Sequence, residues 1–119
     1  MNNFIKGRLQ SFKYAFKGFY LLLTTEDSII AQLIVFSLLI LLGLYLGISK
    51  QEWINQSLGM GLVLSVEGLN TSLEKLADFT HKEHHPRIGF IKDVAAGAVT
   101  FAAFTFLTIF LITYLPYFF

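Results

Sequence analysis

Hydrophobic positions along the chain fall into long blocks separated by short polar stretches. Residues 28–49 carry no charged side chain, and neither do residues 94–119. About 20 consecutive apolar residues are enough for a helix to cross the hydrocarbon core of a bilayer. A third long segment, residues 53–79, is apolar at first and polar in its second half. The pattern predicts three membrane-spanning helices, over residues 27–49, 53–79 and 93–117.

The N-terminal residues differ from these blocks because basic and aromatic side chains are interleaved in them. The basic residues are Lys6, Arg8, Lys13 and Lys17, and the aromatic ones are Phe4, Phe12, Tyr14, Phe16, Phe19 and Tyr20. Such a mixture is typical of an amphipathic helix that lies in the headgroup region of a membrane. We expect this surface helix over residues 4–23, with a solvated basic tail as the alternative.

Polar stretches between the blocks predict the connections. Thr24 or Thr25 is expected to cap the first spanning helix, because threonine is a favoured cap. Residues 50–52 are expected to form a short polar turn. Residues 80–93 are the only long hydrophilic stretch, and Pro86 should prevent them from forming one continuous helix.

The composition favours one membrane domain over residues 1–119. Hydrophobic residues make up 55% of the chain and charged residues 14%, against about 25% in typical soluble domains. The chain has no cysteine, which excludes a disulfide framework, a thiolate nucleophile and a cysteine-based metal site. A net charge of +1 gives no indication of a nucleic-acid partner.

Lysine and arginine positions predict the orientation in the membrane. Four precede the first predicted span, one lies in the first connection and three lie in the stretch 80–93. Because cytoplasmic segments carry an excess of these residues, we expect the N-terminus and the stretch 80–93 to be cytoplasmic.

Four polar side chains share one face of the second predicted span. Glu67, Asn70, Glu74 and Asp78 are spaced 3, 4 and 4 residues apart, which forms a stripe about 16 Å long on a helix. A charged side chain at the bilayer centre costs about 3 kcal/mol or more, so acids inside a membrane are usually functional. The stripe predicts a site that holds a cation or moves a proton.

Phosphoryl transfer from ATP is one chemistry that fits this set. It needs a divalent cation, a positive charge on the phosphate oxygens and a group that orients the attacking hydroxyl. Glu26 and Glu74 offer carboxylates of the kind that Mg²⁺ binds. Lys92 offers the positive charge, and Glu67, the deepest acid, is the candidate general base.

Three residues of the stripe also have a structural explanation, which is weaker for Glu67 because no basic residue lies within a helical turn of it. Glu74 is able to pair with Lys75 or Lys82 at the membrane surface. Asp78 is close enough to the membrane edge to be simply solvated. Asn70 is equally compatible with a hydrogen bond between helices.

Three histidines, His81, His84 and His85, are a second candidate for metal binding. Their spacing is only a weak match to a metal site. Solvated loop histidines are the commoner case.

Two other classes of function compete with phosphoryl transfer. One is a small proton-coupled membrane transporter that uses Glu67 as its coupling carboxylate. Such transporters keep the acid in the first of four spans, whereas here it lies in the second of three. The other is a membrane scaffold without chemistry, which leaves the acidic stripe unexplained.

The segment EGLNTSLEKLAD, residues 67–78, resembles the E-x-x-N-[ST]-[AS]-[IL]-E-x-x-x-D signature of the bacterial integral-membrane diacylglycerol kinase and undecaprenol kinase family. KDVAAGAV, residues 92–99, preceded by His85-Pro86, is similar to a second family motif and looks slightly closer to the undecaprenol kinase branch. The resemblance extends from Ser11 to the end of the third span. This chain departs from the family at residues 28–30, where an arginine is common and Ser-Ile-Ile occurs here.

The resemblance implies an all-α homotrimer in the bacterial inner, or cytoplasmic, membrane, with sites shared between neighbouring subunits. It implies transfer of the γ-phosphoryl group of MgATP to the hydroxyl of diacylglycerol or undecaprenol. Glu67 is then the general base, Asn70 supports it, and Glu26 and Glu74 hold Mg²⁺. The residues implied to contact ATP are Tyr14, Glu26, Glu74, Glu83, His84, His85, Lys92 and Asp93.

Overall fold

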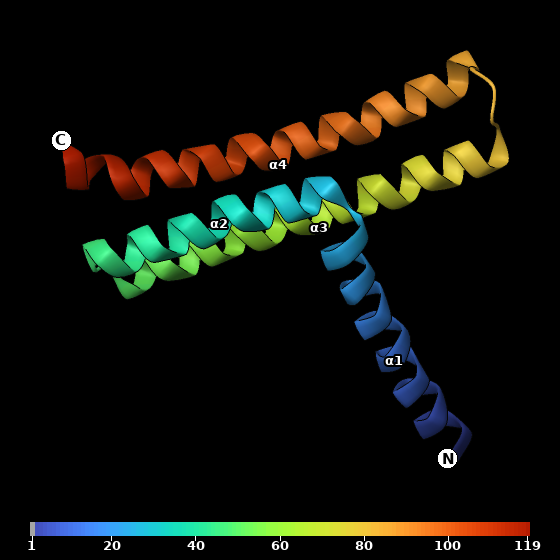
Figure 1. The fold of residues 1–119 in the computed structure, drawn as a ribbon, viewed down its shortest axis with the longest axis horizontal. Helices are drawn as coiled ribbons and strands as arrows, with labels where there is room; N and C mark the ends of the chain where they lie inside the picture. Colours follow the sequence, from blue (N-terminus) through green and yellow to red (C-terminus); the bar gives the residue numbers. More distant parts are fainter. Residues whose placement is uncertain (1) are drawn as a thin grey trace.

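The computed structural model describes residues 2–119, which form four α-helices (Figure 1). Their bounds are α1, Asn2–Thr25; α2, Asp27–Leu46; α3, Lys50–Thr80; and α4, Pro86–Phe118. Helices α2, α3 and α4 lie side by side, each antiparallel to the next along the chain, whereas α1 leaves this bundle at a steep angle. The expected all-α fold, with one N-terminal helix followed by three long helices, is confirmed.

The connection between α2 and α3 lies three residues earlier than expected. Residues 50–52 form the first turn of α3, and residues 47–49 make the turn instead. Ser49 caps α3: its hydroxyl accepts a hydrogen bond from the Glu52 amide (3.1 Å), and the Glu52 carboxylate accepts one from the Ser49 amide (2.9 Å). Such a capping box satisfies two backbone donors that a helix start leaves free. Gly47 ends α2 with φ +65°, a conformation that glycine adopts without steric cost.

The long hydrophilic stretch is mostly helical, so the expected loop over residues 80–93 is too long. α4 begins at Pro86, and only residues 81–85 connect it to α3. Proline suits this position because the first amide of a helix has no acceptor within the helix. His85 caps α4, with its Nδ1 accepting the Arg87 amide (3.1 Å). Pro86 therefore starts a helix rather than interrupting one.

The threonines expected to cap the first spanning helix belong to α1. Thr24 and Thr25 donate their hydroxyl hydrogens back to the carbonyls of Tyr20 (2.8 Å) and Leu21 (2.6 Å). Glu26 occupies the cap position of α2, but its side chain makes no capping hydrogen bond.

The core lies where α2, α3 and α4 meet. Phe36 of α2 packs with Met60 and Val63 of α3 and with Ala102 of α4. Further from the α2 start, the Tyr114 hydroxyl of α4 donates to the Leu39 carbonyl of α2 (3.1 Å). The same hydroxyl forms a hydrogen bond with the fully buried Gln56 side chain of α3. One tyrosine thus connects all three helices.

Two glycines allow close contact between helices. A Cβ at Gly43 would lie 2.9 Å from the Trp53 ring, and one at Gly59 would lie 3.0 Å from Phe106 and Ile109. Gly61, by contrast, has no atom within 4 Å of the place where its Cβ would be. Close packing at this segment of α3 therefore depends on Gly59.

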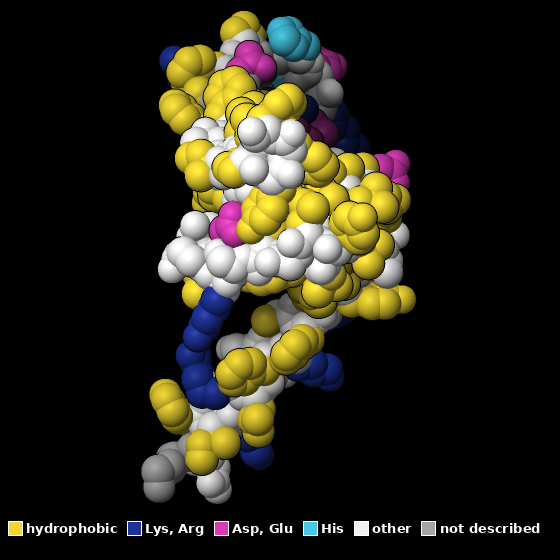
Figure 2. All heavy atoms as spheres, turned by 90° about the vertical axis from the view of Figure 1, so that its left-hand side faces the viewer, with side chains coloured by type: hydrophobic (Ala, Val, Ile, Leu, Met, Phe, Trp, Pro, Cys, Tyr) yellow, Lys and Arg dark blue, Asp and Glu magenta, His cyan; other side chains and the backbone are white. Residues whose placement is uncertain are grey.

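Helices α2 and α4 are long and apolar enough to cross a membrane, judged by length and composition. Most of their surface is exposed, and Figure 2 shows hydrophobic side chains over the bundle and basic side chains along α1. With 20 residues, α2 is about 30 Å long, which is the thickness of a hydrocarbon core. With 31 residues, α3 is about 46 Å long and extends well past α2.

We predict that Gly43→Ala destabilises the protein, because the new methyl group collides with the Trp53 ring. Overpacking of this kind costs about 1–3 kcal/mol. The measurement is thermal unfolding of the purified protein in detergent. Gly61→Ala is the matched control, since its methyl group meets open space and alanine is the better helix former. Equal stability of the two variants would contradict the close contact at Gly43.

Candidate functional site

Five carboxylates from two helices line one cavity of about 370 Å³, which we call the carboxylate cavity. Glu26 and Asp27 come from the start of α2, and Glu67, Glu74 and Asp78 come from α3. The remaining lining residues are Thr25, Ser28, Thr71 and Lys75. Because the acidic stripe begins beside the start of α2, the antiparallel pairing of these helices gathers acids that are about 40 residues apart in sequence.

Hydrogen bonds hold the stripe residues in different ways. Ser28 Oγ donates to Glu67 Oε1 (2.9 Å), which links α2 to α3. Asn70 Nδ2 donates to Glu74 Oε1 (3.1 Å) within α3. Asn70 is buried, and its Oδ1 has no hydrogen-bond partner among residues 2–119. A buried acceptor without a donor costs about 1–3 kcal/mol, so Asn70 is held beside Glu74 at some cost in stability.

Asp78 is paired rather than simply solvated. Lys92 of α4 donates to Asp78 Oδ1 (2.5 Å), an ion pair that joins α4 to α3 across the short connection. Beside the pair is a second cavity of about 260 Å³, the loop cavity. Its lining residues are Asp78, His81, Lys82, Glu83, His84, His85, Ile88, Gly89 and Lys92. Asp78 borders both cavities, so the two adjoin.

Two of the loop histidines bind backbone atoms. His81 Nδ1 lies 2.6 Å from the Glu83 carbonyl, and His85 Nδ1 accepts the Arg87 amide. The rings of His81 and His85 are 5.3 Å apart. Among residues 2–119 no group of three histidine, aspartate or glutamate side chains has the geometry to hold a metal on its own. The hydrogen bonds of His81 and His85 thus help to shape the loop and the start of α4.

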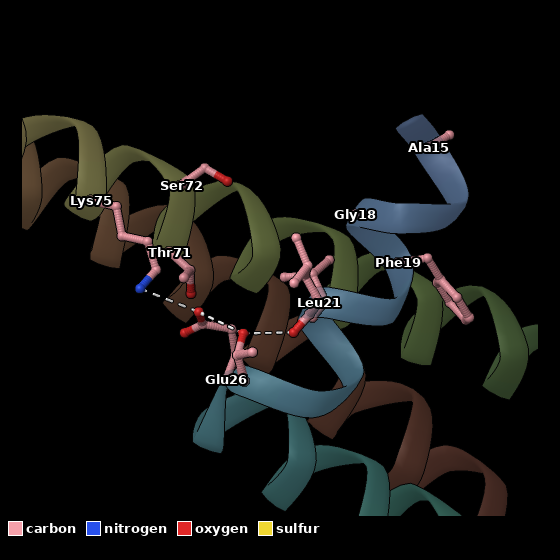
Figure 3. A pocket seen from close by; sticks show the side chains of 10 residues that line it. Ala15, Gly18, Phe19, Leu21, Glu26, Thr71, Ser72 and Lys75 are labelled. Atoms are coloured by element: carbon pink, nitrogen blue, oxygen red, sulfur yellow. Dashed lines mark hydrogen bonds and ion pairs between the residues drawn. The ribbon is translucent and has the colours of Figure 1, made fainter. Parts of the chain in front are cut away.

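A third cavity, of about 650 Å³, lies between α1 and α3, and we call it the α1 cavity (Figure 3). Ala15, Gly18, Phe19, Leu21 and Leu22 form its apolar wall along α1. Its polar lining residues are Thr25, Glu26, Thr71, Ser72 and Lys75. Four of these five also line the carboxylate cavity. An apolar space thus opens directly onto the carboxylates.

Lys75 pairs with Glu26 and not with Glu74. Its Nζ lies 3.4 Å from Glu26 Oε1, the oxygen that also accepts a hydrogen bond from the Thr25 hydroxyl (3.4 Å) (Figure 3). The structural explanation considered for Glu74, an ion pair with Lys75, is therefore wrong. Glu74 is left with Asn70 as its hydrogen-bond partner.

The residues expected to form the site are brought together in two groups. Glu26, Glu67 and Glu74 share the carboxylate cavity, and Glu83, His84, His85 and Lys92 line the loop cavity. Tyr14 and Asp93 line none of the three cavities, and Tyr14 lies exposed on α1. Both would have to reach a ligand from outside these cavities.

Sequence reasoning did not identify Ser28, Thr71 or Lys75 as site residues. Ser28 lies in the stretch where the family resemblance is weakest, yet its hydroxyl is the one that binds Glu67. Thr71 occupies the [ST] position of the family signature, which gave it no role of its own, and Lys75 falls at a position that the signature leaves open. Their place beside the carboxylates is seen only once α1 and α2 pack against α3.

Carboxylate oxygens are ligands that Mg²⁺ prefers, and it usually takes one or two of them together with phosphate and water. Glu26 and Glu74, on different helices but in one cavity, provide such a pair. The residues present therefore fit a magnesium ion that completes its shell with phosphate oxygens.

Comparison with known proteins shows that the chain is similar in sequence to lipid kinases. Residues 13–114 match the family model described as prokaryotic diacylglycerol kinase. The chain is 32% identical to an undecaprenol kinase of Bacillus subtilis over 98% of its own length and 91% of that protein. It is 38% identical to a diacylglycerol kinase of Helicobacter pylori over 61% of its length and 58% of that protein.

Proposed function

The chain belongs to the prokaryotic diacylglycerol kinase family and is a lipid kinase, and we propose that it transfers the γ-phosphoryl group of ATP to a membrane lipid alcohol with Glu67 as the general base. The acceptor is diacylglycerol or undecaprenol, each of which carries one hydroxyl above a long apolar tail. Membership in a kinase family decides against the transporter and the scaffold as alternatives.

The observation that supports this proposal most strongly is the order of the three cavities. The α1 cavity is apolar and suits a lipid tail, the carboxylate cavity holds the acids, and the loop cavity offers Lys92 to an anionic ligand. Neighbouring cavities share lining residues. A lipid hydroxyl and the phosphates of ATP would therefore approach the carboxylate cavity from its two sides.

Glu67 is suited to act as the base. Ser28 binds one of its carboxylate oxygens, Oε1, which fixes the carboxylate and leaves Oε2 for the hydroxyl proton of the substrate. A base positioned within hydrogen-bond distance of the reacting hydroxyl contributes about 10²–10⁴-fold to the rate.

Glu26 and Glu74 would hold the magnesium ion that accompanies ATP. When bound, the ion neutralises negative charge on the phosphate oxygens during the transfer. Lys92 reaches the phosphates only by leaving Asp78. An ion pair as exposed as this one contributes about 1 kcal/mol or less, so breaking it costs little free energy.

The membrane arrangement and assembly are also part of the proposal. With the basic N-terminus and the loop of residues 81–85 in the cytoplasm, all three cavities open toward the compartment that contains ATP. Helix α1 would lie along the inner membrane surface, and α3 would span the membrane beside α2 and α4. We propose a homotrimer, because the cavities on this thin bundle are open and a neighbouring subunit would cover them.

We predict that Glu67→Gln lowers the rate of lipid phosphorylation by about 10²–10⁴-fold, because the amide cannot accept the proton. The assay measures ATP-dependent phosphorylation of diacylglycerol and of undecaprenol by purified protein in mixed micelles. Glu52→Gln is the matched control on the same helix, since Glu52 binds Tyr117 and Ser49 at the other end of the bundle. Normal activity of Glu67→Gln would remove Glu67 from the mechanism, and the better of the two lipids identifies the substrate.

We predict that Glu26→Gln and Glu74→Gln each raise the Mg²⁺ concentration needed for half-maximal activity. Each change removes one charged ligand while keeping the size of the side chain. Titration of activity with Mg²⁺ at saturating ATP measures the effect, and Glu52→Gln, at the other end of the bundle, is again the control. An unchanged Mg²⁺ requirement in both glutamate variants would place the metal elsewhere.

We predict that subunits share sites, so that two inactive variants complement each other. Glu67→Gln and Lys92→Ala chains, co-folded in one oligomer, should recover part of the activity, because some mixed sites contain both wild-type residues. The measurement is lipid phosphorylation by mixed oligomers of verified composition. No recovery would mean that both residues of a site come from one chain.

A further inference from the structure

The Glu26–Lys75 ion pair occupies a place where the proposed function requires a metal ion. Glu26 is the residue before α2, yet its side chain does not cap that helix. It reaches across to α3, where its Oε1 meets Lys75 Nζ at 3.4 Å. The Glu26 carboxylate thus pairs with a cation on another helix instead of capping α2. This indicates a role in the cavity rather than in helix stability.

Lys75 lies at the junction of two cavities. It lines both the α1 cavity and the carboxylate cavity, together with Thr25, Glu26 and Thr71 (Figure 3). Of the residues that line the carboxylate cavity, it is the only one with a positive charge, against five carboxylates. The Lys75 ammonium group therefore places a positive charge beside Glu26, the proposed metal ligand, where a metal ion would place one.

We propose that Lys75 is a tethered cation that competes with the divalent ion for Glu26 and is withdrawn when nucleotide binds. This inference rests on the proposed function, because it takes Glu26 as a metal ligand and ATP as the co-substrate. In the absence of nucleotide, Lys75 neutralises Glu26 and disfavours a free divalent cation. Metal then enters this site mainly together with nucleotide.

The exposure of the two partners makes such an exchange feasible. The Lys75 side chain is 69% exposed and the Glu26 side chain 19% exposed, so Lys75 has open space to move into and Glu26 is the more enclosed partner. Phosphate groups of a bound nucleotide bring negative charge to the same cavity and give the ammonium group an alternative partner. Lys75 then moves from Glu26 toward phosphate, and the metal takes its place.

The test measures metal binding directly and does not depend on turnover. Mn²⁺, which binds the same carboxylate ligands as Mg²⁺, is titrated into the full-length protein and followed by electron paramagnetic resonance. Lys75→Met should bind Mn²⁺ about two- to fivefold more tightly than wild type without nucleotide, the range expected for removal of a partly exposed ion pair. With a non-hydrolysable ATP analogue at saturation, this difference should disappear.

Two controls isolate the ion pair from general effects of charge. Lys75→Arg keeps the pair and should bind Mn²⁺ like wild type. Lys50→Met removes one positive charge at the start of α3, at the opposite end of the helix, and should also bind like wild type. Because the Lys75 side chain is mostly exposed, its replacement is not expected to disturb the fold.

The outcomes separate this inference from the proposed function. If Lys75→Met binds Mn²⁺ no more tightly than wild type, or keeps its advantage when nucleotide is bound, the competition is disproved while the kinase activity stands. If wild type neither binds Mn²⁺ with nucleotide nor phosphorylates a lipid alcohol, the proposed function itself is overturned.

Discussion

The register between α2 and α3 is the constraint on which the rest of the structure depends. A three-residue turn, residues 47–49, reverses the chain, Gly43 admits the Trp53 ring, and Phe36 packs against Met60. These contacts together bring Ser28 level with Glu67. A shift of one residue would rotate α3 by about 100° and move it by about 1.5 Å, which would turn the acidic stripe away from Glu26.

The different lengths of α2 and α3 reduce the cost of placing acids in a membrane helix. Glu67 lies beside the start of α2, and the last 13 residues of α3, residues 68–80, continue beyond it. Glu74 and Asp78 therefore lie about 10 and 16 Å further along the helix. If α2 crosses the bilayer, the acidic stripe begins at the membrane surface, at Glu67, and extends along α3 away from the membrane. The sequence pattern alone suggested a deeper position for Glu67.

Polar groups at the two ends of the bundle serve different purposes. Far from the carboxylate cavity, Tyr114 binds Leu39 and Gln56, and these bonds hold α2, α3 and α4 together. At the carboxylate cavity, by contrast, the ion pairs of Glu26 with Lys75 and of Asp78 with Lys92 are partly exposed. Exposed pairs stabilise a fold little and exchange partners easily. That end of the molecule is therefore suited to ligands, and the other end to stability.

The sequence by itself determined the number and type of the helices and the face on which Glu67, Asn70, Glu74 and Asp78 lie, because hydrophobic blocks and helical periodicity are local properties. It misplaced the helix ends near residues 50–52 and 80–93, because a polarity pattern does not distinguish a polar turn from a polar first helical turn; the local start signals there are the Ser49–Glu52 capping box and Pro86 at the first position of α4. Only the tertiary structure joined Ser28 to Glu67 and Lys75 to Glu26. Such contacts arise from the register and crossing of separate helices, and no spacing within one segment encodes them.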